Sequence, residues 1–440
     1  MAGVDRISLL PLEIKISVLS RLRVKDAVRT SALAHSWRHL WTLLPRLRLD
    51  CSVEWLGVRE FGDFYAYNTT WMERVVDLVS SLRGPVLDFQ LFYRWVDRLS
   101  PSLLLRLLDL LLQKGGLQML DLHNFNHACR AVISLPGFHA LKVLKLCSVH
   151  LVLPTGFRGF NLLTELELLD TQISSEDINL LIHTSNNLTS SVRLWLESAK
   201  DPLSVNISFP LLRHLKFVIT DSIERVSMIS APCLEKACIC HCDLYNYTPE
   251  KLAQVTLGLV TSVSMVSSLT LGFNALKYFS LVTLPFNFTF PRLRFLRFDL
   301  NVDTMDKRMY DAFVWLLRSM PFLEELEIEL QGDEFSQTDR VAILTRELLA
   351  KKHDGFACLD RSVRSVAIYM YGLKVTASIG MAQFFLLNAK VLKELKITYW
   401  ADGMIMPSMI EELQKLEIVS SDAKVVIFDR ITGKNTVVCL

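Results

Sequence analysis

Cysteine and histidine gather most densely in one short stretch of the chain. Cys233, Cys238, Cys240 and Cys242 lie close together and flank His241. Zinc prefers thiolate and imidazole ligands in tetrahedral sets of four, usually with two cysteines separated by a few residues. Cys238 and Cys240 are two residues apart on a predicted strand, so they share one face while His241 points to the other. The spacing favours small apolar thiols packed along a strand, and we predict that no metal is bound here.

Other residues that could support catalysis do not match known motifs. His123 and His127 lack the Glu of the helical zinc-protease motif and follow a predicted strand, which indicates a surface turn. The sequence contains no glycine-rich phosphate loop and no G-x-S-x-G elbow. A Ser-His-Asp triad can be assembled from distant positions, so composition does not exclude one. Nothing in the sequence locates such a triad, and we expect neither an enzyme nor a bound cofactor.

The composition describes a folded chain with many apolar residues. Of 440 residues, 51% are hydrophobic and 21% charged, which excludes a disordered chain. The net charge of +2 gives no basic field of the kind that nucleic-acid partners require. The sequence shows no apolar run of the ~20 residues needed to span a membrane, and no apolar leader. We therefore expect no membrane contact, reduced cysteines, and a location in the cytoplasm, the nucleus or both.

The first fifty residues differ from the rest in charge. They carry nine Lys and Arg residues against four Asp and Glu. Three short helices are predicted: one after Pro11 to about Leu22, one at about 25–34, and one that follows Ser36 and stops at Pro45. The first is apolar on two faces. So short a segment cannot bury that much apolar surface alone. Either it packs on the rest of the chain, or one face is reserved for another protein.

A leucine pattern then returns along the remaining chain. Copies of Leu-x-x-Leu-x-Leu, with substitutions, begin at Leu117, Leu141, Leu163, Leu212, Leu234, Val266, Leu293, Leu323, Val363, Leu392 and Leu413. Many successive copies start 21 to 32 residues apart, a period typical of leucine-rich-repeat solenoids. Each unit predicts one short strand whose alternate residues enter the core. The predicted fold is α/β, with a small three-helix module followed by an irregular repeat solenoid with parallel strands.

Two segments resemble a known family. Leu10-Pro11, Lys25-Asp26-Ala27-Val28 and Trp37-Arg38-x-Leu40-Trp41 resemble the F-box of plant F-box/leucine-rich-repeat proteins. Leu387-Asn388-Ala389 and its neighbours resemble the family's FBD module, although Leu373-Lys374-Val375-Thr376 stands where the family usually has acidic residues. The predicted domains are an F-box at 1–50, a linker and first repeat at 51–115, a solenoid at 116–354 and an FBD-like module, continuing the repeats, at 355–440.

The resemblance implies a non-catalytic subunit of an SCF-type ubiquitin ligase. Such a subunit binds a Skp-type adaptor, and through it a cullin, while its repeats bind a protein target for ubiquitin-dependent degradation. Residues expected to form or support the adaptor contact are Leu10, Pro11, Ile14, Val18, Leu22, Trp37 and Trp41. Two alternatives stay open: a repeat protein whose F-box does not support ubiquitin transfer, and a small-molecule receptor. The latter needs converging basic residues, for which the sequence offers only His214, Lys216 and Lys236.

Outward-facing positions of two neighbouring repeats suggest where a target binds. They are Phe295, Arg297, Glu325, Glu327 and Glu329. In register, Arg297 would lie beside Glu327 and neutralise part of an otherwise acidic surface. We expect the remaining acids and the exposed aromatic ring to suit a target segment rich in Lys and Arg.

Overall fold

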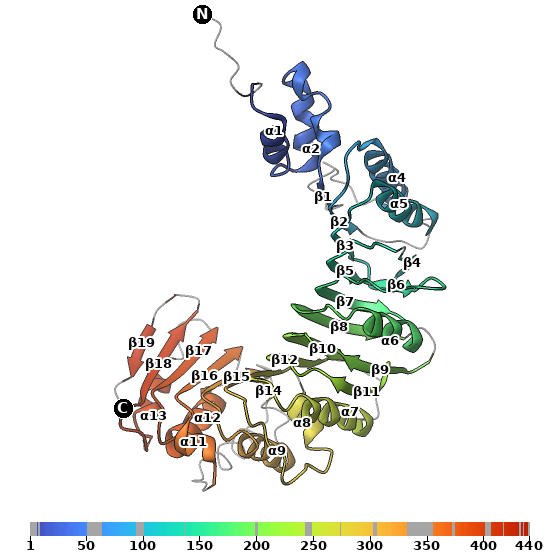
Figure 1. The fold of residues 1–440 in the computed structure, drawn as a ribbon. Coiled ribbons are helices and arrows are strands. Elements are labelled where there is room, and N and C mark those ends of the chain that lie inside the picture. Colours follow the sequence, from blue (N-terminus) through green and yellow to red (C-terminus); the bar gives the residue numbers. More distant parts are fainter. Residues whose placement is uncertain are drawn as a thin grey trace, which may run out of the picture. The chain divides into compact units, whose positions relative to one another are not determined.

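The computed structural model describes residues 7, 9–50, 64–93, 101–135, 137–198, 201–242, 249–272, 274–301, 306–331, 355–371, 375–400, 406–416, 418–430, 433 and 435–438. Figure 1 labels the helices and strands along the chain. The chain divides into two compact units. The first contains Met1–Leu212 with Ile229–Ala231, and the second contains Arg213–Met228 with Pro232–Leu440. The main boundary lies between Leu212 and Arg213, and strand β11 (Ile223–Ser230) is divided between the two units.

The amino-terminal module is helical, as predicted, but its helices are shorter. Its elements are α1 (Leu12–Leu19), α2 (Val24–Arg29) and the 3-10 turns η1 (Thr30–Ala32), η2 (His35–Trp37) and η3 (Leu40–Leu43). The predicted single third helix is therefore wrong. His39, between the last two turns, has φ −121° and ψ 5°, which interrupts the helical path. The Thr30 hydroxyl donates to the Ala27 carbonyl at 2.6 Å, a local bond of the kind that competes with continued α-helix.

The first unit is built on a parallel sheet. Its strands are β1 (Arg46–Asp50), β2 (Asp88–Tyr93), β3 (Met119–Asn124), β4 (Ala131–Ser134), β5 (Val143–Cys147), β6 (Val149–Val152), β7 (Glu165–Gln172) and β8 (Ser191–Glu197). Strand β9 (Leu203–Ser208) belongs to a separate two-stranded sheet. Parallel pairing runs from β1 through β2, β3, β5 and β7 to β8, and β4 pairs with β6. Residues 46–50, within the predicted F-box region, thus form a strand of this sheet.

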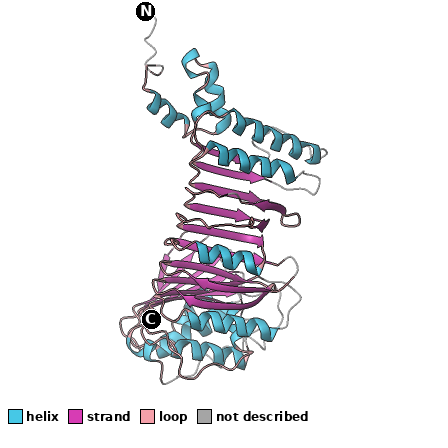
Figure 2. Cartoon of the chain, turned by 45° about the vertical axis from the view of Figure 1, so that its right-hand side comes forward, coloured by secondary structure: helices cyan, strands magenta, loops and turns pink. Residues whose placement is uncertain are grey.

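Helices cover one face of these strands (Figure 2). They are α4 (Phe64–Ser81), α5 (Pro101–Lys114) and α6 (Ser175–Thr184). Alternate strand residues such as Leu120, Leu144 and Leu166 are fully buried, so the period-two pattern places the core under the helices. Ser174 caps α6 by accepting a hydrogen bond from the Asp177 backbone N–H at 3.0 Å. The opposite strand face carries polar side chains, among them Gln90, Lys145 and Glu167.

The second unit repeats this architecture. Its strands are β10 (His214–Ile219), β12 (Lys236–His241), β13 (Ser268–Leu271), β14 (Phe295–Asn301), β15 (Glu325–Gln331), β16 (Ser365–Tyr371), β17 (Glu394–Trp400), β18 (Lys424–Asp429) and β19 (Asn435–Val438). Neighbours in this order pair in parallel, except that β19 is antiparallel to β18. One predicted copy is wrong: Leu413 ends a helix, and the strand lies further along, with Val425 and Ile427 buried.

The helices of the second unit pack on one side of its strands. They are α7 (Pro249–Ser262), α8 (Ala275–Phe279), α9 (Lys307–Arg318), α11 (Ala357–Arg361), α12 (Val375–Asn388) and α13 (Met406–Leu413). Asp306 caps α9 by accepting from the Met309 backbone N–H at 2.8 Å, and α9 buries Phe313, Leu316 and Leu317. Strands of the FBD-like region continue the parallel sheet. Residues 372–374 of that region lie outside the described residues.

The predicted fold class is confirmed: a short helical module precedes mostly parallel strands of leucine-rich-repeat type. Among the described residues, no helix has both the length and the apolar character needed to cross a membrane.

Candidate partner-binding surfaces

Helix α1 has one buried face and one exposed apolar face. Leu19 is fully buried, and the buried Lys15 holds its ammonium group 5.8 Å from the centre of the Trp37 ring. On another face, Ile14 and Val18 are one turn apart and are 48% and 45% exposed, while Leu22, just beyond the helix, is 41% exposed. Three large apolar side chains left this open are unusual in so small a module. We call Ile14, Val18 and Leu22 the apolar strip.

The other predicted contact residues have different positions. Pro11 is exposed at the start of α1, and Leu10 and Trp41 are half-buried. Trp37 is only 4% exposed, so it supports the module from inside. Sequence reasoning missed Ile7, Leu9 and Leu33, which are all highly exposed, because single apolar residues outside a helical stripe give no periodic signal.

A row of polar side chains crosses the open face of the first unit. In the sheet register, one residue from each of six strands stands side by side: Arg48, Gln90, Asp121, Lys145, Glu167 and Arg193. Lys145 Nζ lies 2.9 Å from Glu165 Oε1 and 3.7 Å from Glu167 Oε2, and Arg193 lies 3.3 Å from Glu167. Charges of both signs therefore compensate each other along much of the row.

Aromatic rings lie beside this row. The Arg48 guanidinium is 4.9 Å from the centre of the Phe92 ring, and Phe92 stacks on His123 with 5.7 Å between ring centres. His123 in turn lies 4.9 Å from the exposed Phe125 ring. Burial, followed by the nearby His127, lowers the pKa of His123. His127 lies in the predicted surface turn, but the prediction was wrong for His123, which lies on β3.

The predicted target-binding residues share the open face of the second unit. Phe295 is beside Glu325 and Arg297 is beside Glu327 in the register of β14 and β15. Arg297 reaches Glu329 at 2.5 Å and Glu327 at 3.6 Å, and the three side chains are 40%, 16% and 27% exposed, respectively. Burial opposes the Arg297 charge, but the hydrogen bond and charge of Glu329 outweigh it and raise the pKa of Arg297. Glu325 has no ion pair among the described residues, and Arg297 supplies one positive charge to its two partners Glu327 and Glu329, so the group stays acidic.

The cysteine cluster follows strand alternation. Cys238 Sγ and Cys240 Sγ lie 3.4 Å apart on the open face of β12, whereas His241 is buried and its Nε2 lies 2.8 Å from Thr256 Oγ1. The hydrogen bond between the thiols lowers the pKa of Cys240 to about 7 and raises that of Cys238. No group of three or more Cys, His, Asp or Glu among the described residues could hold a metal ion.

A serine, a histidine and an aspartate meet in the first unit. Ser148 Oγ donates to Asp170 Oδ2 at 2.6 Å and lies 2.7 Å from His127 Nδ1, which is itself 2.9 Å from Asp170 Oδ2. Because the serine and the aspartate meet the same ring nitrogen, the histidine cannot pass a proton between them as in a catalytic triad. Ser148 is also fully buried. Ser148 and Asp170 both have a positive φ, 53° and 47°, which is uncommon for residues other than glycine. The hydrogen bonds of the cluster stabilise this backbone conformation.

Comparison with known protein families agrees with this architecture. Residues 7–49 match the F-box domain, and residues 104–328 match the family model described as FBD-associated F-box protein At5g56370, LRR repeats. The second match covers about half of the chain. The chain therefore belongs to the family of FBD-associated F-box proteins with leucine-rich repeats, and these domains are those of a protein-interaction adaptor.

Individual relatives come from Arabidopsis thaliana. FBD-associated F-box protein At5g22730 is 37% identical over 22% of this chain and 22% of its own length. F-box/FBD/LRR-repeat protein At1g13570 is 30% identical over 48% of each chain. F-box/FBD/LRR-repeat protein At5g53840 is 25% identical over 96% of this chain and 95% of its own length. The chain thus matches less than half of the length of the two relatives with the higher identities. It matches nearly the whole length of the relative that is 25% identical.

Proposed function

We propose that this chain is the substrate-recognition subunit of an SCF-type ubiquitin ligase. Its F-box binds a Skp-type adaptor and through it a cullin, and its repeats bind a protein target. The observation that carries the proposal is the apolar strip, which lies within the matched F-box and is left uncovered by the described part of the chain. Fully burying an exposed side chain of this size contributes ~1.5–3 kcal/mol, and these three are less than half exposed, so a partner that covers all three gains roughly 2–4 kcal/mol.

The mechanism is proximity. A target held on the repeats has its lysines at a high effective concentration near a ubiquitin-charged enzyme on the same scaffold. We assign no bond-making step to this chain, because the Ser148, His127 and Asp170 groups lack a triad's geometry. The open strand faces of the two units provide polar and aromatic side chains for target binding.

The adaptor contact is tested by replacing Ile14 and Val18 with Glu in the full chain. Two buried charges without partners would prevent docking, so adaptor pull-down should be abolished. The matched control is Ile229→Glu with Val437→Glu, which changes the same residue types at exposed positions outside the F-box. Thermal melting should be similar for both variants. Undiminished pull-down by the Ile14 and Val18 variant would refute the assignment.

Ubiquitin transfer needs a separate test, because an F-box can bind an adaptor without supporting transfer. Proximity labelling in plant cells, with and without proteasome inhibition, should identify the targets. Proteins that accumulate among the labelled set when degradation is blocked are the expected substrates, and their ubiquitination should require intact Ile14 and Val18. Labelled partners whose abundance and ubiquitination stay unchanged would instead support a binding protein with a silent F-box.

A further inference from the structure

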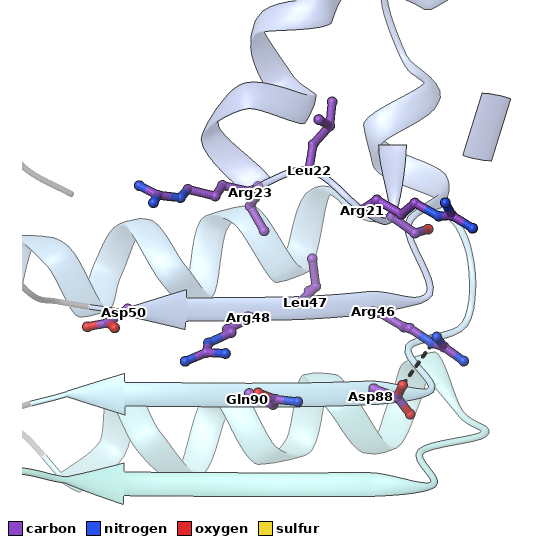
Figure 3. A pocket seen from close by; sticks show the side chains of 11 residues that line it. Arg21, Leu22, Arg23, Arg46, Leu47, Arg48, Asp50, Asp88 and Gln90 are labelled. Carbon is purple, nitrogen blue, oxygen red and sulfur yellow. Dashed lines mark ion pairs between the residues drawn. The ribbon is translucent and has the colours of Figure 1, made fainter. Parts of the chain in front are cut away.

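An open recess of about 500 Å³ lies between the loop after α1 and the first two strands of the same unit (Figure 3). The loop contributes residues 20–23, α2 contributes Val24, and the strands contribute residues of β1 and β2. Four of the lining residues are arginines, Arg21, Arg23, Arg46 and Arg48, and we call this space the arginine recess. Asp50 and Asp88 are the acidic residues of its lining. The lining thus has an excess of two positive charges.

Only one of these arginines has a carboxylate partner among the described residues. Arg46 Nε lies 2.9 Å from Asp88 Oδ2. Arg48 makes no ion pair there and places its guanidinium over the Phe92 ring. Arg21 and Arg23 are exposed and contact no carboxylate in the described part of the chain. Three guanidinium groups at one recess are therefore available to an external anion.

The positions of these groups suit a ligand that enters between loop and strand. In the view of Figure 3, Arg23 from the loop and Arg48 from β1 extend toward one side of the recess, while Arg21 and Arg46 extend toward the other. Arg48 is held by the Phe92 ring, so less of its conformational freedom remains to be lost on binding.

We propose that the arginine recess binds a phosphoryl group. A guanidinium donates two parallel N–H bonds to phosphate oxygens, and a phosphate monoester carries about −1.5 to −2 charges at pH 7, which matches the excess of two positive charges. The recess has room for more than a phosphate ion, so it can accept a phosphoryl group carried by a larger molecule. It is either a small phosphate ester or a phosphorylated residue of a partner protein. The site does not depend on the ubiquitin-ligase proposal.

The experiment measures binding of two probes to the full chain at fixed, physiological ionic strength. The probes are pyrophosphate and a short phosphoserine peptide with its unphosphorylated twin. Arg23→Gln with Arg48→Gln should weaken binding about tenfold or more, since each charge-assisted bond to phosphate is lost. Arg23→Lys with Arg48→Lys keeps the charge but removes the paired donors, and should weaken binding by a smaller factor.

The control is Arg225→Gln with Arg292→Gln, which removes the same charge from exposed arginines of the second unit. Binding of pyrophosphate that only the recess variant weakens supports a small phosphate ester as the ligand. Binding of the phosphopeptide alone, again weakened only by the recess variant, supports a phosphorylated partner protein. The proposal is overturned if neither probe binds, or if the recess and control variants lose affinity equally, because the arginines would then be ordinary surface charges. Melting curves of all variants check that each is folded.

Discussion

Lys145 on β5 stands directly beside Asp121 on β3, yet its ammonium group bonds to the two carboxylates on its other side, Glu165 and Glu167. Asp121 makes no ion pair with any described residue. Its burial raises its pKa from 3.8 to about 6, with Lys145 and Arg48 opposing the rise and Glu167 adding to it. The ionised Asp121 carboxylate is partly desolvated and has no ion-pair partner among the described residues. At neutral pH it therefore lowers the free energy of unfolding.

The first prediction concerns this cost. Because the folded pKa exceeds the unfolded one, the folded chain binds more protons between about pH 4 and 6, and stability falls as the pH rises through that window. Asp121→Asn removes the ionisation. We expect the variant to be more stable than the wild type by about 1–2 kcal/mol at pH 8, and equally stable at pH 4. Urea unfolding of the full chain at both pH values measures this difference.

A suitable control is Asp109→Asn, which replaces an exposed carboxyl of the same unit. It should leave the unfolding midpoint nearly unchanged at both pH values. If Asp121→Asn shifted the midpoint equally at pH 4 and pH 8, the effect would come from packing or hydrogen bonding, and the account of its ionisation would be wrong.

The positions of the strands could be predicted from sequence, because side chains alternate between the two faces of a strand and the same short motif returns in each repeat. Leu326 and Ile328 face the core, and Glu325, Glu327 and Glu329 face outward, as the Leu-x-x-Leu-x-Leu unit requires. Equivalent positions of neighbouring repeats lie side by side in the sheet, so the pairing of Arg297 with Glu327 was also predictable. The exposed face of α1 followed from its second apolar stripe.

Other features depend on long-range geometry or on ambiguous spacing. Leucines three residues apart occur in amphipathic helices as well as repeat strands, so Leu413 and Leu416 mimic a repeat at the end of α13. Ser148, His127 and Asp170 meet through three separate segments and a bulge between Leu168 and Thr171, which no local pattern reveals. The arginine recess likewise needs the fold to bring a loop against β1 and β2.

The second prediction concerns the cysteine cluster. Purified chain should contain no stoichiometric zinc, because zinc requires four converging ligands and Cys238 and Cys240 present only two thiols on the open face. His241 is on the other face and bound to Thr256. Metal analysis by mass spectrometry after gel filtration measures the zinc content. One tightly held zinc ion that disappears in Cys238→Ser with Cys240→Ser, but persists when the exposed Cys233 is changed to Ser, would overturn this prediction.

The third prediction concerns target binding on β14 and β15, which we propose as part of the target surface. Replacing Glu325, Glu327 and Glu329 with Gln should lower the association rate with a Lys- and Arg-rich target by about tenfold at low salt, since complementary charge mainly speeds encounter. The effect should shrink as salt rises. Adaptor binding should not change. The pairs lost with Arg297 lie on a partly exposed strand face and contribute about 1 kcal/mol each, so the variant should stay folded.

A single change separates the charge effect from the loss of these pairs. Glu325→Gln removes the carboxylate that has no ion pair among the described residues and leaves Arg297 bound to Glu327 and Glu329. Glu325→Gln alone should therefore lower the association rate measurably, although by less than the triple variant does. Glu324→Gln is the control, because Glu324 is paired with Arg294 at 2.5 Å and lies outside the outward-facing group. If target capture by the triple variant equals that of the wild type at low salt, the acidic group is solvated surface and the target binds elsewhere on the repeats.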